Sequence, residues 1–327
     1  MMRALVFLLA LVALIALVDG STGDLAAALR PPAAKRIALT FDDAPRGRGA
    51  FFTEDERAAK LIAALKAANV EQVAFFVNPG RISPGDGDEA RIMRYVDAGH
   101  VIANHSFSHP RLSRESADAY LADVDKATAW LAPRAGYRPW FRFPGLDEGG
   151  TDTPKRDAVR AGLAARGLRD AYVTADGLDW NIEAQTIAAA RTGRPMDMDG
   201  LRDLYVETMV QAADFSDGLA IATIGRSPAH VLLLHETDLA ALYIGDLVDA
   251  LRKDGWEVVT PDAAYADPIY ARQPDVRNAS GTLIEQLAAE RHVAGPRWYA
   301  RDDVKVGDAL FDSRVLAPAA RGRAQGR

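Results

Sequence analysis

Two adjacent carboxylates and a pair of histidines stand out among the residues that could do chemistry. Asp42 and Asp43 directly follow an apolar run, and His105 and His109 are four positions apart. Neighbouring carboxylates point in different directions, so one can bind a metal ion while the other accepts a proton. Two imidazoles at this spacing can bind one cation, and one Asp with two His leaves open positions for water, as catalytic zinc requires. A solvated turn and two unrelated histidines are the simpler alternative.

These residues have to be positioned by the strands that precede them. Seven short apolar segments alternate with helical patterns, which predicts parallel strands in an α/β fold, either a doubly wound sheet or a barrel. Polar residues that could be catalytic follow five of the seven segments, among them Arg142, Asp179 and His235. In a parallel barrel the active site lies at the carboxyl ends of the strands, where these side chains would meet. The expected strands are 36–41, 72–77, 101–103, 140–143, 171–174, 230–234 and 256–259.

The pattern indicates a single catalytic domain over residues 36–262. A linker at 21–35 would precede this domain, and a C-terminal extension with a basic tail would occupy 263–327. Residues 182–226 are helical in pattern and contain no strand, so we expect an insertion of one or two helices there.

Residues 1–20 have the layout of a secretory signal. Arg3 precedes a run of fifteen apolar residues, and small residues follow. The run is shorter than the roughly 20 residues of a membrane-spanning helix. We therefore expect export from a bacterial cell, to the periplasm or the medium. In the alternative, an uncleaved N-terminal anchor would be the protein's contact with the membrane.

The composition excludes several classes of protein and partner. None of the 327 residues is a cysteine, which excludes disulfides, thiolate zinc sites and cysteine nucleophiles. Apolar residues make up 49% and charged residues 26%, as in a globular protein with a core. The net charge of −6 argues against nucleic acid as a partner.

Five short motifs resemble, in order, those of the polysaccharide deacetylases, carbohydrate esterase family 4 with its NodB homology domain. The resemblance implies an irregular, TIM-like seven-stranded (β/α) barrel. It also implies a secreted, metal-dependent hydrolase that removes N-acetyl groups from an amino-sugar polymer or oligomer, such as peptidoglycan, a chitin-type glycan or an exported polysaccharide. The motifs are at 37–45 (IALTFDDAP), 99–110 (GHVIANHSFSHP), 142–145 (RFPG), 176–180 (DGLDW) and 232–235 (LLLH).

The resemblance assigns a metal site and a base. Asp43, His105 and His109 would bind a divalent ion, most often zinc in the family. Asp42 would be the general base that deprotonates the attacking water, and Arg142 would hold and tune Asp42.

The resemblance likewise assigns an acid and a substrate pocket. His235 would protonate the leaving amine, and Asp179 would orient it. Trp180 would form a wall for the acetyl methyl group. Gly145 stands where the family usually has Tyr, so its backbone N–H could still bind the oxyanion, but we expect a more open groove there.

Two alternatives keep the fold and change the function. The chain could be an O-acetyl esterase or a small-molecule amide or imide hydrolase, or else a non-catalytic carbohydrate-binding protein. The presence of every polar group that the mechanism needs favours an enzyme. Trp130 and Trp298 are further candidates for stacking on a sugar ring.

Overall fold

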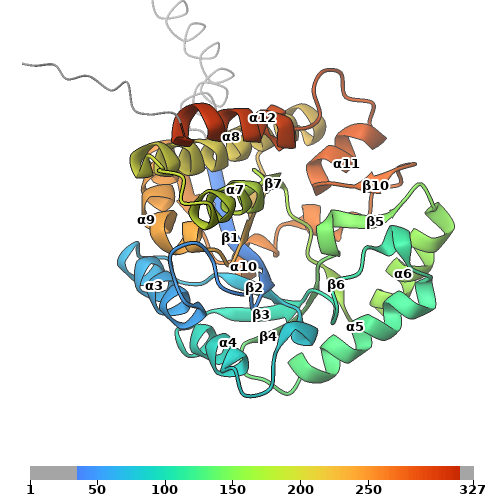
Figure 1. Cartoon of the computed structure of the whole chain (residues 1–327). Helices are drawn as coiled ribbons and strands as arrows, with labels where there is room; N and C mark the ends of the chain where they lie inside the picture. The colour runs from blue at the N-terminus through green and yellow to red at the C-terminus, as the bar shows by residue number, and fades with distance from the viewer. Residues whose placement is uncertain (1–34, 317–327) are drawn as a thin grey trace, which may run out of the picture. The chain divides into compact units, whose positions relative to one another are not determined.

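The computed structural model describes residues 35–316, in which eight strands form one parallel sheet (Figure 1). The strand order is β6-β4-β3-β2-β1-β8-β7, and β9 pairs with the start of β1. The two longest strands, β1 and β8, lie side by side over seven residue pairs. The strands are β1 Lys35–Ala44, β2 Ala74–Val77, β3 Val101–Asn104, β4 Tyr137–Phe141, β6 Arg169–Asp170, β7 Ala175–Asp176, β8 Ala229–His235 and β9 Trp256–Val258.

The sheet is closed by the chain segment that joins β6 to β7. β6 extends the sheet beyond β4, and β7 extends it beyond β8 at the opposite edge. Between them, the N–H of Ala171 donates to the carbonyl of Phe141 (2.7 Å), and that of Thr174 donates to Val231 (3.0 Å). The segment thus passes from one edge to the other, which confirms an α/β fold of the irregular barrel type.

This crossing also corrects one predicted strand. The apolar segment 171–174 is not a strand of its own but the link between β6 and β7. Its first residue, Ala171, bonds to β4, and its last, Thr174, bonds to β8. The segment therefore runs beside neither strand for long enough to form a regular series of inter-strand hydrogen bonds.

The alternation of side chains along β1 separates its packing face from its chemical face. Ile37, Leu39 and Phe41 belong to the core cluster that includes the residues of the outer helices α3 and α9. Ala38 belongs to a second cluster, on the other face. Because side chains alternate along a strand, Thr40 and Asp42 share the face of Ala38.

Helices surround the sheet on its outer side (Figure 1). The larger ones are α3 Glu54–Ala67, α4 Asp88–Asp97, α5 Ala117–Leu131, α6 Thr153–Ala165, α7 Asp179–Arg191, α8 Met198–Ile224 and α9 Asp238–Lys253. The predicted helical stretch at 182–226 corresponds to α7 and α8, with a break at 192–197.

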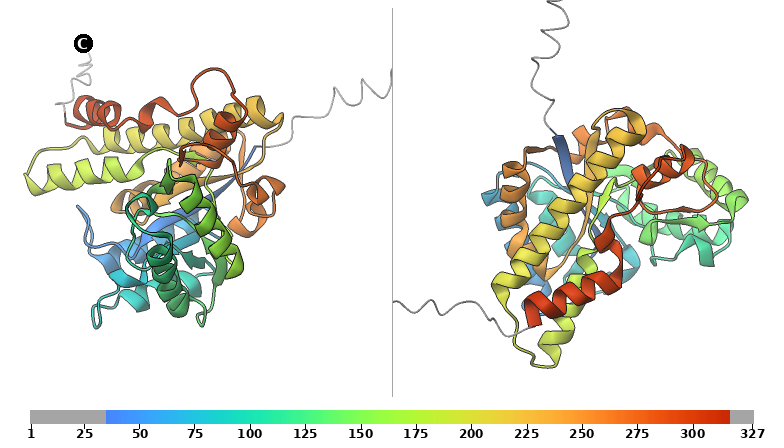
Figure 2. Two further views of the ribbon diagram at one scale, coloured as in Figure 1. Left: turned by 90° about the vertical axis from the view of Figure 1, so that its right-hand side faces the viewer. Right: turned by 90° about the horizontal axis from the view of Figure 1, so that it is seen from above.

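The C-terminal extension packs on the barrel and on α8 (Figure 2). Its strand β10 (Ala279–Ser280) pairs antiparallel with β5 (Asp147–Gly150). Helix α11 (Leu283–Glu290) lies against α8, and α12 (Val304–Phe311) lies against α7 and α8. The shorter helical segments are α10 Pro261–Ala264, η1 Pro79–Arg81, η2 Leu112–Arg114, η3 Pro144–Leu146, η4 Pro268–Ala271, η5 Ala300–Asp302 and η6 Asp312–Leu316.

The predicted signal at 1–20, nearly all of the linker and most of the basic tail lie outside the described residues. Within residues 35–316, no helix combines the length and apolar character needed to cross a membrane.

Candidate active site

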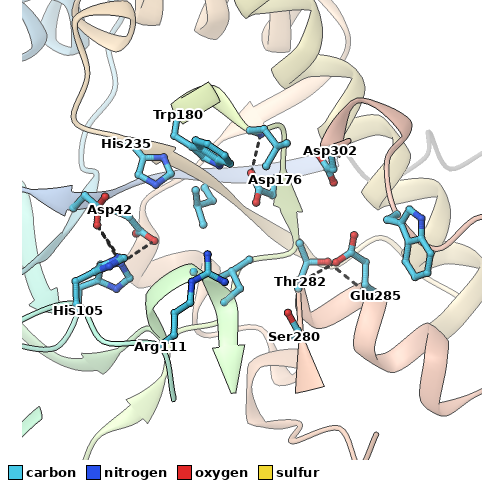
Figure 3. A pocket seen from close by; sticks show the side chains of 18 of the residues that line it. Asp42, His105, Arg111, Asp176, Trp180, His235, Ser280, Thr282, Glu285 and Asp302 are labelled. Atoms are coloured by element: carbon cyan, nitrogen blue, oxygen red, sulfur yellow. Dashed lines mark hydrogen bonds and ion pairs between the residues drawn. The ribbon is translucent and has the colours of Figure 1, made fainter. Parts of the chain in front are cut away.

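The carboxyl ends of β1, β3 and β8 face a cavity of about 470 Å³ (Figure 3). Two of the nine predicted site residues, Arg142 and Asp179, do not line the cavity but bond to residues that do. The seven that line it are Asp42, Asp43, His105, His109, Gly145, Trp180 and His235.

A turn at the end of β1 sends its two aspartates to different partners. Asp42 keeps strand geometry and pairs in register with His235. Asp43 has a φ of 69°, in the left-handed region that non-glycine residues rarely adopt. The carboxylate of Asp43 therefore leaves the alternation of the strand and reaches the histidines that follow β3.

Asp43, His105 and His109 form a candidate metal site. One ligand atom from each lies within 4.8 Å of the others. The Oδ1 atom of Asp43 is 3.0 Å from Nε2 of His109 and 3.7 Å from Nε2 of His105. Nδ1 of His105 lies 2.9 Å from the carbonyl oxygen of Arg142, so an Nδ1–H donor there leaves the Nε2 lone pair directed toward Asp43.

The chemistry of these donors fits a divalent ion. Oδ1 of Asp43 is buried and receives no hydrogen bond from the described residues. Burial would raise the pKa of Asp43, but His109, His235 and His105 outweigh it and hold that pKa well below its usual range. Burial lowers the pKa of His105 to about 4, so its ring is neutral at neutral pH. A carboxylate with two imidazoles suits zinc and similar transition metals.

Two arginines that the sequence did not single out also contact Asp43. Nη1 of Arg46 is 2.8 Å from Oδ2 of Asp43, and Nη1 of Arg81 is 3.2 Å from Oδ1. Arg46 lies in the loop after β1, and its backbone N–H donates to Glu236 (2.9 Å). These contacts fix the carboxylate at the edge of the cavity.

The partner of Asp42 is a buried guanidinium. Nη1 of Arg142 donates to Oδ1 of Asp42 (2.5 Å) and to Oγ1 of Thr40 (2.9 Å), while Nη2 donates to Tyr265 (2.8 Å). Burial would lower the pKa of Arg142, but Asp42 outweighs it and the pKa is raised. Oδ2 of Asp42 stays turned toward the metal site, 3.6 Å from Nε2 of His105.

His235 is held by Asp179, the first residue of α7. Nδ1 of His235 is 2.7 Å from Oδ1 of Asp179, and the backbone N–H of His235 donates to Oδ2 (2.7 Å). Asp179 is fully buried. Burial would lower the pKa of His235, but the carboxylate of Asp179 outweighs it and the pKa is raised.

Gly145 has a φ of 61°, and the space beside it is taken by an arginine. A Cβ atom at this position would lie 3.1 Å from the guanidinium of Arg111. Arg111 also lines the cavity. The guanidinium of Arg111 therefore occupies part of the space beside Gly145.

The far wall of the cavity comes from the C-terminal extension, which matches none of the five motifs. Two tryptophans were proposed for sugar stacking. Trp298 lines the cavity, whereas Trp130, on α5, lies under the guanidinium of Arg134. Burial, with the charges of Asp176 and Glu285, raises the pKa of Asp302 to about 9. The residues that the extension contributes are Ser280, Gly281, Thr282, Glu285, Trp298 and Asp302.

Comparison with known proteins agrees with the first three of the five motifs, which lie within the matched region. Residues 30–165 match the sequence model described as polysaccharide deacetylase. Residues 30–165 therefore carry the sequence pattern of this family. A peptidoglycan-N-acetylglucosamine deacetylase of Bacillus cereus is 32% identical over 117 residues, 34% of this chain and 36% of that protein. The deacetylase PgdA of Listeria monocytogenes, with the same activity in its name, is 26% identical over 238 residues, 72% of this chain and 40% of that protein.

The chain thus spans less than half the length of these two curated relatives. Among solved structures, a family 4 carbohydrate esterase from Streptomyces lividans in complex with acetate is 21% identical, with a TM-score of 0.46. The alignment covers 71% of this chain and 97% of that one.

The metal site can be tested by removing its imidazoles. His105→Ala and His109→Ala should abolish stoichiometric zinc or other divalent metal in the purified protein, measured by elemental analysis. His292→Ala is the matched control. The φ of His292 is 55°, close to the 62° of His109, but His292 is exposed and lies outside the cavity. A full metal content in either ligand variant would show that the ligands are assigned wrongly.

Proposed function

We propose that this protein is a metal-dependent deacetylase that hydrolyses N-acetyl groups of an amino-sugar glycan, such as peptidoglycan. The observation that carries the proposal is the convergence of three groups on one cavity: the Asp43 metal site, the carboxylate of Asp42 and the imidazole of His235. The names of the two curated relatives support an N-acetylglucosamine unit of a glycan as the substrate class.

Asp42 is the general base in this proposal. When bound at Asp43, His105 and His109, a divalent ion such as Zn²⁺ would lower the pKa of a water and polarise the acyl carbonyl. Oδ1 of Asp42 already accepts from Arg142, so Oδ2, on the side of His105, takes the proton of the attacking water.

His235 is the general acid. Because Nδ1 is bonded to Asp179, Nε2 carries the proton that reaches the leaving nitrogen. An amine anion is too basic to leave unprotonated, so this transfer is needed for amide cleavage. Asp179 stabilises the imidazolium before the transfer and fixes the orientation of the ring. We assign Trp180 to the acetyl methyl group and the N–H of Gly145 to the oxyanion, since both residues line the cavity.

Acetate release by the purified protein with added zinc tests the proposal. Peptidoglycan fragments and N-acetylglucosamine oligomers should release acetate, and O-acetylated xylan should release much less. His235→Ala should keep its metal but lose about 10²–10⁴-fold in rate on the amide. His292→Ala should keep the normal rate. Release from xylan alone would replace the proposal by an esterase, and a normal rate for His235→Ala would refute the acid assignment.

The pairing of His235 with Asp179 predicts a pKa change. Asp179→Asn removes the charge that offsets burial, so the pKa of His235 should fall. NMR titration of the imidazole signals measures this directly, with His235→Ala to assign the signal among the six histidines. An unchanged pKa in Asp179→Asn would mean that another group keeps this imidazole protonated.

We also propose that the protein is exported, on the basis of residues 1–20. Mass spectrometry of the native protein should find a new N-terminus near Ser21 in the periplasm or medium. An intact Met1 on protein from the cytoplasmic fraction would contradict export.

A further inference from the structure

The wall of the cavity opposite the metal site belongs to the C-terminal extension. In Figure 3, Asp42, His105 and His235 lie at one end, and Glu285 and Asp302 lie at the other. The wall residues, between 280 and 302, follow the region that matches the family model, residues 30–165, by more than a hundred positions. The far wall of the cavity therefore lies outside the matched region.

Two tryptophans of this cavity are unusually exposed for aromatic residues. Trp298 is 64% exposed and Trp180 is 38% exposed. They are the only aromatic side chains among the exposed large apolar residues of 35–316. Two exposed indoles at one cavity form a surface that a ligand with an apolar face can cover. A flat aromatic face beside hydrogen-bonding groups fits a sugar ring, whose C–H face is apolar and whose edge carries hydroxyls.

Trp298 shares the cavity with polar groups that can hydrogen-bond to such a ring. Ser280, Glu285 and Asp302 also line the cavity. Oδ1 of Asp302 is buried and has no hydrogen-bond partner among the described residues. A hydroxyl group can donate to this oxygen.

The residues next to Trp298 in the chain are anchored to α8. The hydroxyl of Tyr299 donates to Gln211 (2.9 Å), and Nη1 of Arg301 donates to Thr208 (3.0 Å). The helical insertion therefore supports the segment that carries Trp298. A support of this kind reduces the ordering cost when a ligand binds.

Helix α11 ties the rest of the wall to the barrel. The N–H of Leu283 donates to the carbonyl of Val173 (2.9 Å), within the segment that closes the sheet. Gln286 donates to Glu148 (2.8 Å) next to β10. Helix α11 of the wall is thus hydrogen-bonded both to the segment that closes the sheet and to β5.

We propose that Trp298, with Ser280, Glu285 and Asp302, forms a second sugar subsite that binds the ring next to the one being deacetylated. The inference rests on the proposed function, because it takes deacetylation as the reaction at the metal end. A cavity of about 470 Å³ is in the usual range for a small-molecule site. The substrate that fits is a short amino-sugar oligosaccharide or the end of a longer chain.

Chain-length dependence of the reaction tests the subsite. The wild-type protein should have a higher kcat/KM for the trisaccharide of N-acetylglucosamine than for the monosaccharide. Trp298→Ala should reduce the ratio of these two values by about tenfold, as expected for one lost stacking contact. Trp298→Phe, which keeps an aromatic face, should restore most of the ratio. An unchanged ratio in Trp298→Ala would overturn the subsite.

Equilibrium binding separates this inference from the proposed function. The glucosamine trisaccharide has no acetyl group to lose, so its affinity can be measured calorimetrically whether or not the protein is a deacetylase. Trp298→Ala should weaken its binding about tenfold, whereas Val304→Ala, at another exposed position outside the cavity, should not. Equal affinities of Trp298→Ala and the wild type would overturn the subsite even if acetate is released.

Discussion

The guanidinium of Arg142 links the barrel to the chemistry at its mouth. Its side chain bonds to Asp42 and Thr40 of β1 and to Tyr265, and its own carbonyl oxygen accepts from the ring of His105. One residue thus orients both the proposed base and a metal ligand. Only 1% of the side chain is exposed, and losing one partner of a buried ion pair costs about 3–5 kcal/mol. The function and the stability of this barrel therefore depend on the same contact.

The two ends of the cavity have different origins in the chain. The metal end is built on strand ends, where the alternation of side chains and the left-handed turn at Asp43 set the directions of the carboxylates. The far end is built from the C-terminal extension, which pairs with β5 and packs against the inserted helix α8. An insertion and an extension far apart in sequence thus cooperate to shape one wall.

Strand periodicity and the five motifs were enough to predict the barrel. Of the nine candidate site residues, seven line one cavity, and Arg142 and Asp179 bond to residues that line it. The segment 171–174 was misread because its apolar character reflects burial, whereas its hydrogen bonds go to two different strands. Arg46 and Arg111 were missed because a surface loop arginine gives no periodic pattern, and only the fold places it beside Asp43 or Gly145. The residues of the far wall, apart from Trp298, were also missed. They match none of the five motifs, and only the fold brings them to the cavity.

The central claim is that Asp42 and Asp43, although adjacent, have separate tasks because Arg142 holds one and the histidines hold the other. The most direct test measures metal content and acetate release for Asp42→Asn and Asp43→Asn side by side. Asp42→Asn should keep stoichiometric metal and lose most of its activity, whereas Asp43→Asn should lose both. A metal-free Asp42→Asn protein, or an Asp43→Asn protein with a full metal content, would contradict the account.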